Sequence, residues 1–185
     1  MAKQFVEDPA GRQRLAFEEV TDERGTEVLL VEDWVEPGGD VPPHVHPHQE
    51  ERFLVLDGEV TFTVGRRRRR ARSGQTVVVP PGTRHAFRNA GTETAHMRVR
   101  PARDLQGFLE ETARLGREGH IARLGPLRVP GRPSSVPAVA RLLRRYRENT
   151  VILMPPPLVQ RLMLDPLARL AERRPAAPPR SAPDA

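Results

Sequence analysis

Four side chains with metal-binding groups lie in the first half of the chain, and three of them are histidines. His44 and His46 are two residues apart, Glu51 follows them, and His85 lies further along the chain. In an extended strand, residues two apart point to the same side, so both imidazoles of the pair can reach one ion. Three neutral nitrogens and one carboxylate suit one divalent first-row metal ion such as Fe, Mn, Ni, Cu or Zn. An octahedral ion held in this way keeps positions for substrate, water or dioxygen.

The same residues allow other interpretations. Glu50 is an alternative to Glu51, but neighbouring strand residues face opposite ways. His48 has the phase of His46, and we expect a solvated loop histidine there rather than a fifth ligand. A vestigial polar core without metal is less favoured, because burying this cluster unpaired is unfavourable. As non-ligand acids or bases, the sequence offers only His48, His96 and Glu50, so the catalytic residues are unknown.

Short strands must position the four donor side chains. Between residues 14 and 100, eight or nine runs of apolar and β-branched residues alternate with turn signals such as Asp57-Gly58. Val60, Phe62 and Val64 alternate with threonines, which is the pattern of a strand with one buried face. This spacing predicts a mainly β, antiparallel barrel or sandwich over residues 12–101, after an N-terminal segment of residues 1–11.

The pattern becomes helical after Pro101. Asp104 can cap a helix with Leu105, Phe108 and Leu109 on its apolar side. We expect a helical extension over residues 102–174, with a Pro/Gly/Ser linker near 126–137 and two basic amphipathic helices after it. Residues 175–185 are rich in proline and alanine and are predicted to be disordered.

Length and composition limit the classes of protein. A chain of 185 residues holds one core and one extension, and the absence of cysteine excludes disulfide scaffolds, thiolate zinc sites and cysteine nucleophiles. No secretory signal is visible, and no apolar run is long enough to cross a bilayer, so we expect a cytoplasmic protein.

Basic charge is concentrated in the second part of the chain. The formal net charge is +6, and Lys3 is the only lysine. The run Arg66–Arg70, together with Arg72, is predicted to form a solvated hairpin; an acidic partner is less favoured and nucleic acid is unlikely. We favour packing of the basic helices against the barrel or a dimer interface over association with a membrane surface.

Two motifs in this chain resemble those of the cupin family. The first, G-x5-H-x-H-x(3,4)-E-x6-G, and the second, G-x5-P-x-G-x2-H-x3-N, are separated by fifteen residues. The resemblance covers residues 29–100 and implies a single cupin barrel (a double-stranded β-helix, or jelly roll) with a buried metal site, and a homodimer. The matching positions are Gly38, His44, His46, Glu51, Gly58, Gly74, Pro80, Gly82, His85 and Asn89.

The strand phase also predicts which residues line the interior. Phe53 and Val55 share the phase of Glu51, and Phe87 shares that of His85, while Trp34 and His96 are weaker candidates; packing in the core is the alternative for each of these residues. The sequence therefore predicts a metal-binding cupin that takes a small oxygenated organic molecule, with dioxygenase-like oxidoreductase chemistry as the first hypothesis. Isomerase or lyase chemistry and a non-catalytic binding or sensor protein are the alternatives.

Overall fold

The fold was obtained as a computed structural model of the chain. It describes residues 5–22, 24–100, 105–125, 127–153 and 156–164, together with residues 166 and 169. The helix cap expected at Asp104, the barrel boundary at residue 101 and the disordered tail expected at 175–185 lie outside the described residues.

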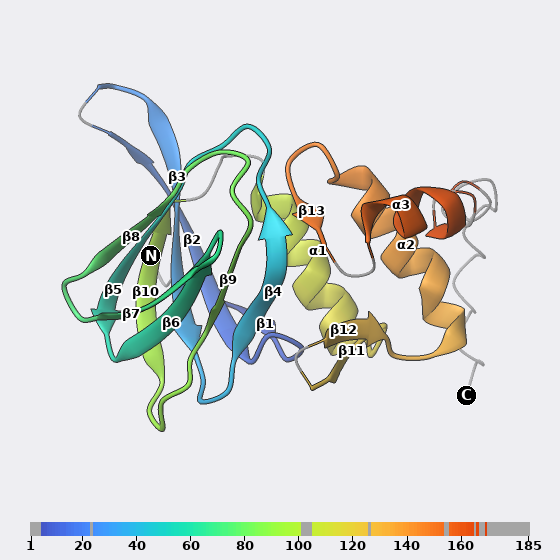
Figure 1. Cartoon of the computed structure of the whole chain (residues 1–185), viewed down its shortest axis with the longest axis horizontal. Coiled ribbons are helices and arrows are strands. Elements are labelled where there is room, and N and C mark those ends of the chain that lie inside the picture. The colour runs from blue at the N-terminus through green and yellow to red at the C-terminus, as the bar shows by residue number, and fades with distance from the viewer. Residues whose placement is uncertain are drawn as a thin grey trace, which may run out of the picture.

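Two antiparallel sheets form the barrel, with the helices gathered on one side of it (Figure 1). This confirms the predicted fold class, a mainly β antiparallel barrel with a helical extension. The larger sheet has the order β1 (Phe5–Asp8), β2 (Gln13–Thr21), β3 (Glu27–Val35), β10 (Ala95–Arg100), β5 (Glu51–Asp57) and β8 (Thr76–Val79). The smaller sheet has the order β13 (Val151–Ile152), β4 (Asp40–Val45), β9 (His85–Arg88), β6 (Glu59–Val64) and β7 (Arg67–Arg72).

The barrel core follows from the two-residue period of its strands. In β10, Ala95, Met97 and Val99 are buried while the residues between them are more exposed. β5 repeats this pattern, and its inner residues Phe53 and Val55 join the same cluster. Each buried side chain of this size stabilises the fold by about 1.5–3 kcal/mol, so the inner faces of the two sheets hold the barrel together.

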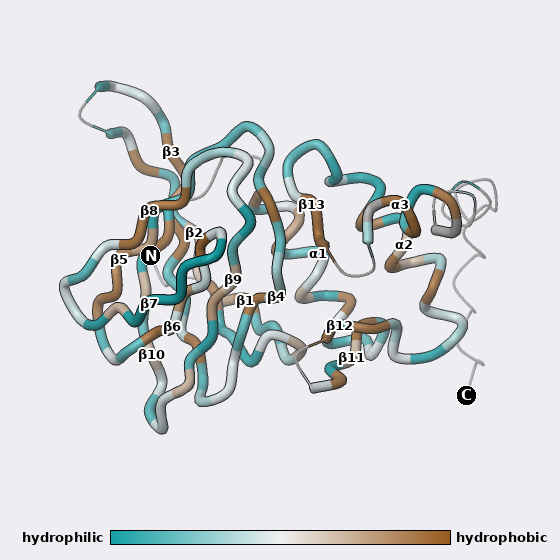
Figure 2. The backbone as a smooth tube through the Cα atoms, in the orientation of Figure 1, coloured by the Kyte–Doolittle hydropathy of each residue, from teal (hydrophilic) through white to brown (hydrophobic). Residues whose placement is uncertain are grey.

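The arginine run forms the edge hairpin that the sequence predicts. β6 and β7 pair in register, with Val64 opposite Arg67, and Figure 2 shows β7 as a hydrophilic strand. The arginines of β7 are exposed, and Glu59 on β6 forms ion pairs with Arg70 and Arg72. A charged edge strand of this kind discourages pairing with another sheet.

The C-terminal extension is less helical than expected. Residues 127–130 of the expected linker form a strand that pairs with residues 121–124, because Leu127 and Val129 give this short stretch an extended pattern between its turn residues. β13 adds a further strand to the barrel itself. The elements of the extension are α1 (Leu105–Arg117), β11 (Ile121–Leu124), β12 (Leu127–Pro130), the 3-10 helix η1 (Pro133–Ser135), α2 (Val136–Arg145), β13, α3 (Pro157–Val159) and the π-helical turn η2 (Gln160–Leu164).

A second apolar cluster joins the helices of the extension, and an ion-pair network fastens the extension to the barrel. The apolar cluster includes Phe108 of α1 and Leu142 of α2. In the ion-pair network, Asp40 on β4 accepts hydrogen bonds from Arg123 and Arg128 of the β11–β12 hairpin, and all three side chains are largely shielded from solvent. Among the described residues, no helix is long and apolar enough to cross a membrane.

Candidate metal centre

Three strands of the barrel bring the four predicted donor residues together. His44 lies on β4 and His46 directly after it, while Glu51 begins β5 and His85 begins β9. All four side chains are buried, and one donor atom from each lies within 4.8 Å of the others. We call these four residues the histidine-glutamate cluster. Donors bound to a first-row metal at about 2.0–2.2 Å lie at most about 4.4 Å apart, so the cluster is only slightly wider than a metal site.

Backbone carbonyls fix the orientation of all three imidazoles. The Nδ1 atoms of His44, His46 and His85 each lie 2.9 Å from a carbonyl oxygen, those of Pro42, Asn149 and Thr83 respectively. Because a carbonyl only accepts hydrogen bonds, each Nδ1 carries a proton. A neutral ring then has its lone pair on Nε2, which is the form that binds metal.

Glu51 supplies the negative charge of the cluster. Its Oε2 lies 2.9 Å from His85 Nε2 and 3.5 Å from His46 Nε2. Burial opposes ionisation, but the close contact with His46 and the hydrogen bond with His85 outweigh it and lower the pKa of Glu51 to about 2. The carboxylate is therefore ionised across the physiological range.

The histidines of the cluster differ in how readily they accept a proton. Burial, with the neighbouring charge of His85, lowers the pKa of His44 to about 3, so His44 is neutral. Burial also acts to lower the pKa of His46, but the close contact with the Glu51 carboxylate raises this pKa overall. A proton on His46 thus occupies the Nε2 atom that a metal ion would use.

One buried atom in the cluster tests whether a cation fits. Among the described residues, His46 Nε2 is buried and has no hydrogen-bond partner, since its 3.5 Å contact with Glu51 lacks hydrogen-bond geometry. A buried polar atom in this state is unfavourable. A cation shared by the Nε2 atoms and the Glu51 carboxylate would satisfy it, so the residues present fit a metal ion.

The extension contributes to this site, which the sequence did not indicate. β13 pairs with β4, placing Ile152 opposite His44 and Val151 opposite Val45. The carbonyl that fixes His46 belongs to Asn149, just before β13, and Thr150 Oγ1 lies 3.2 Å from the same Nδ1 atom. A backbone carbonyl cannot be recognised from the residue type, and a single threonine more than a hundred residues away in the sequence gives almost no indication that it contacts the site.

A cavity of about 70 Å³ lies beside the histidine-glutamate cluster between the two sheets. Residues of α1 and β13 cover it on the side of the extension, so its walls come from both parts of the chain. It is lined by Gln13, Leu15, Val31, Asp33, Val41, His44, His46, Glu51, Phe53, Phe87, Val99, Leu105, Phe108, Leu109, Thr150 and Ile152.

The structure separates the predicted pocket residues into two groups. Phe53 and Phe87 line the cavity, and Val55 is buried in the core without lining it. Trp34 and His96 lie elsewhere: their rings stack on the outer face of the large sheet with centroids 4.4 Å apart. The prediction for these two is corrected, because they alternate with the inward-facing neighbours Asp33 and Met97.

The alternative ligands lie outside the cluster. His48 and Glu50 are both exposed, and Glu50 pairs with Arg52 at 2.6 Å. His96 forms a hydrogen bond of 2.6 Å with Glu32 on the outer face. These placements leave Glu51 as the carboxylate of the cluster.

Asp33 is a cavity residue that the sequence analysis did not select. It is buried, and its Oδ2 accepts a hydrogen bond of 3.3 Å from Gln13 Nε2. A signal was available, since Asp33 has the phase of Val31 and Val35 and is the acidic residue on an otherwise apolar face. Burial first, and then the charges of Asp8 and Glu51, raise the pKa of Asp33 well above its usual value.

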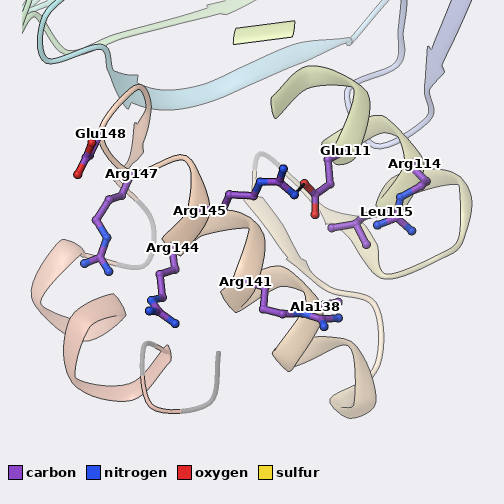
Figure 3. A pocket seen from close by; sticks show the side chains of 9 residues that line it. All are labelled: Glu111, Arg114, Leu115, Ala138, Arg141, Arg144, Arg145, Arg147 and Glu148. Carbon is purple, nitrogen blue, oxygen red and sulfur yellow. Dashed lines mark ion pairs between the residues drawn. The ribbon is translucent and has the colours of Figure 1, made fainter. Parts of the chain in front are cut away.

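A larger cavity of about 660 Å³ lies away from the barrel, between α1 and α2. Figure 3 shows its arginines spread over α1, α2 and the turn after α2, with the side chain of Arg145 directed toward Glu111 at 3.7 Å. None of the four cluster residues lines it. The chemistry suggested by the sequence therefore belongs to the smaller cavity.

Comparisons with known proteins place the barrel in a family. The model of the cupin domain matches residues 34–99. Germin-like protein 3-5 of Oryza sativa subsp. japonica is 41% identical over 71 residues, which cover 34% of this chain and 31% of that protein. Oxalate oxidase 1 of Hordeum vulgare is 37% identical over 71 residues, covering 34% and 35% of the two chains. The chain thus spans about a third of the length of these relatives.

Two solved structures align with part of the chain. A recombinant oxalate oxidase in complex with glycolate aligns with 28% identity and a TM-score of 0.43, covering 53% of this chain and 54% of that chain. An oxalate decarboxylase formate complex from Lactobacillus farciminis aligns with 20% identity and a TM-score of 0.45, covering 53% and 30%. Residues 34–99 thus form a domain of the cupin superfamily.

Proposed function

We propose that this cupin is a metal-dependent oxidoreductase that acts on a small oxygenated organic molecule. His44, His46, Glu51 and His85 would hold one divalent first-row metal ion. The single observation that carries the proposal is the shared orientation of the three imidazoles, whose Nδ1 atoms each meet a backbone carbonyl at 2.9 Å. This leaves three Nε2 atoms and one carboxylate directed at a common point, which is a donor set typical of redox-active metals.

The residues around the cluster prepare the site in two ways. A bound divalent ion supplies Lewis acidity and, where it is redox-active, electron transfer. The low pKa values of Glu51 and His44 keep both residues in their metal-binding protonation states. Phe53, Phe87 and Phe108 line the cavity, and apolar walls of this kind strengthen the electrostatic interactions beside them.

The relatives support an oxidoreductase over the other cupin activities. Oxalate oxidase 1 of Hordeum vulgare is an oxidase by name, and it matches this chain over 71 residues. Because the match covers only about a third of either chain, the activity and substrate remain proposals for this protein.

Metal content tests the site directly. We expect about one divalent ion per chain in the purified protein, and its loss in His46→Ala. The matched control is His48→Ala, which removes an exposed histidine two residues away and should keep the metal. Elemental analysis of both variants, with circular dichroism as a check of folding, would contradict the site if His46→Ala retained the metal.

Turnover tests the reaction. Oxygen uptake by iron- or manganese-loaded protein would be followed across diketones, flavonoids, phenolic acids and short organic acids. Oxygen consumption that depends on the metal and one substrate class supports the oxidoreductase. Ligand-induced melting shifts without turnover across the panel would instead support a binding or sensor cupin.

A further inference from the structure

Asp33 is a buried carboxyl group that the histidine-glutamate cluster does not use. It lies on the inner face of β3, between Val31 and Val35, and is only 4% exposed. It lines the same cavity as the cluster. An acidic group in an apolar wall is unfavourable unless it has a partner, so its surroundings indicate what it binds.

Only one of the two carboxyl oxygens of Asp33 has a hydrogen-bond partner among the described residues. Oδ2 accepts from Gln13 Nε2 at 3.3 Å, whereas Oδ1 is buried and has no partner among the described residues. Gln13 on β2 therefore fixes one oxygen and leaves the other available. Because Asp33 lines the cavity, a molecule in that space is the partner within its reach.

The groups that face Asp33 favour its protonated form. Asp8 from β1 and Glu51 from β5 both act on it with negative charge, Gln13 from β2 is neutral, and no cation pairs with it among the described residues. Burial and these two charges favour the neutral acid. A neutral carboxyl whose Oδ2 accepts from Gln13 has its O–H on Oδ1, where it can donate to a ligand.

The other side of the cavity favours negative charge. A divalent ion held by three neutral imidazoles and one carboxylate keeps one net positive charge. The cavity, at about 70 Å³, is far smaller than the cavity of about 660 Å³ between α1 and α2. Its size therefore favours a small ligand.

We propose that Asp33, held in place by Gln13, contacts the ligand of the metal centre, and that this ligand is a small organic anion accepting a hydrogen bond from the Asp33 carboxyl. The proposal rests on the proposed metal site and adds to it the class of ligand and the residue that recognises it. It also gives the site a non-ligand acid, which none of the residues weighed in the sequence analysis provides.

The first test measures the protonation of Asp33 without any metal. Infrared spectra of metal-free protein at neutral pH should show the carbonyl stretch of a protonated carboxylic acid that Asp33→Asn lacks. Glu59→Gln is the control, because it removes a carboxylate that pairs with Arg70 and Arg72 at the surface and should leave the acid band unchanged. The Asp33 band should fade as the pH is raised and the carboxyl ionises. A spectrum at neutral pH unchanged by Asp33→Asn would overturn the proposal.

The second test measures binding of a probe anion, acetate, to cobalt-loaded protein by visible absorption. Loss of a buried hydrogen bond predicts about ten- to 100-fold weaker acetate binding in Asp33→Leu. Asp33→Asn keeps an N–H donor and should lose less. Glu32→Gln, which removes a carboxylate of the same strand on the outer face of the sheet, is the control and should bind acetate as the wild type does.

The outcomes distinguish this proposal from the metal site itself. Cobalt content should be the same in the wild type and in all Asp33 variants. If the wild type takes up no cobalt, the proposed function fails while the infrared result still decides the state of Asp33. If cobalt binds and Asp33→Leu binds acetate as tightly as the wild type does, the ligand role of Asp33 is wrong.

Discussion

The barrel and the C-terminal extension contribute to the same site in different ways. The barrel provides every side chain of the histidine-glutamate cluster, from β4, β5 and β9 and their ends. The extension provides none of them, but it provides the carbonyl that orients His46 and part of the wall that covers the cavity. The comparison teaches that the residues able to bind an ion and the residues that position and enclose it come from separate parts of the chain.

The largest expected effect concerns the cover of the cavity. Phe108 of α1 is buried, lines the cavity and packs against Tyr146 with ring centroids 5.6 Å apart. Phe108→Ala should lower the free energy of unfolding by about 3–5 kcal/mol, because it removes an aromatic ring from a packed site. It should also speed removal of the metal by a chelator, as measured by stopped-flow mixing.

A matched control for Phe108 lies in the same extension. Leu124 on β11 is 65% exposed, so Leu124→Ala should change unfolding by less than about 0.5 kcal/mol. If Phe108→Ala and Leu124→Ala behaved alike in urea unfolding and in chelation, the extension would not act as a cover for the barrel.

The next effect concerns the attachment of the extension to the barrel. Asp40→Asn removes the carboxylate that Arg123 and Arg128 share and leaves two shielded guanidinium groups without it. We expect a loss of about 3 kcal/mol in urea unfolding. Glu59→Gln, which breaks only the exposed pairs of the β6–β7 hairpin, should lose at most about 1 kcal/mol. Equal losses would mean that the Asp40 network does not join the two regions.

The smallest expected effect concerns the orientation of the His46 ring. Thr150→Val removes the hydroxyl 3.2 Å from His46 Nδ1 while keeping the shape of the side chain. We expect metal affinity to fall by about tenfold, with a change of about 1 kcal/mol in unfolding. Thr63→Val, at an exposed position on β6, is the control and should leave affinity unchanged. A competition titration with a chromogenic chelator measures both; unchanged affinity in Thr150→Val would restrict the role of the extension to covering the site.

The barrel and the cluster were predictable because both depend on short-range rules. Strand alternation and the spacing of His44, His46 and Glu51 indicate which side chains share a face, and turn residues mark where the strands end. His85, from a distant strand, completed the donor set, and the family resemblance supported its inclusion. These features need no knowledge of how the extension packs.

The features that the sequence did not predict correctly depend on tertiary contacts, or on which residues of a strand face the interior of the barrel. Trp34 and His96 were placed inside the barrel, although the neighbours Asp33 and Met97 hold the inward positions. The β11–β12 hairpin and β13 are too short to stand out among proline and glycine residues. Their pairing depends on contacts such as those of Asp40 with residues more than eighty positions away.

The carbonyl of Asn149 has a consequence for genetics. Every amino acid carries the same backbone carbonyl, so His46 keeps its hydrogen-bond acceptor whatever side chain occupies position 149. Substitution scanning would therefore class residue 149 as tolerant, even though the site depends on it. Replacing the amide with an ester there, or inserting one residue before β13, would reveal a dependence that side-chain changes leave hidden.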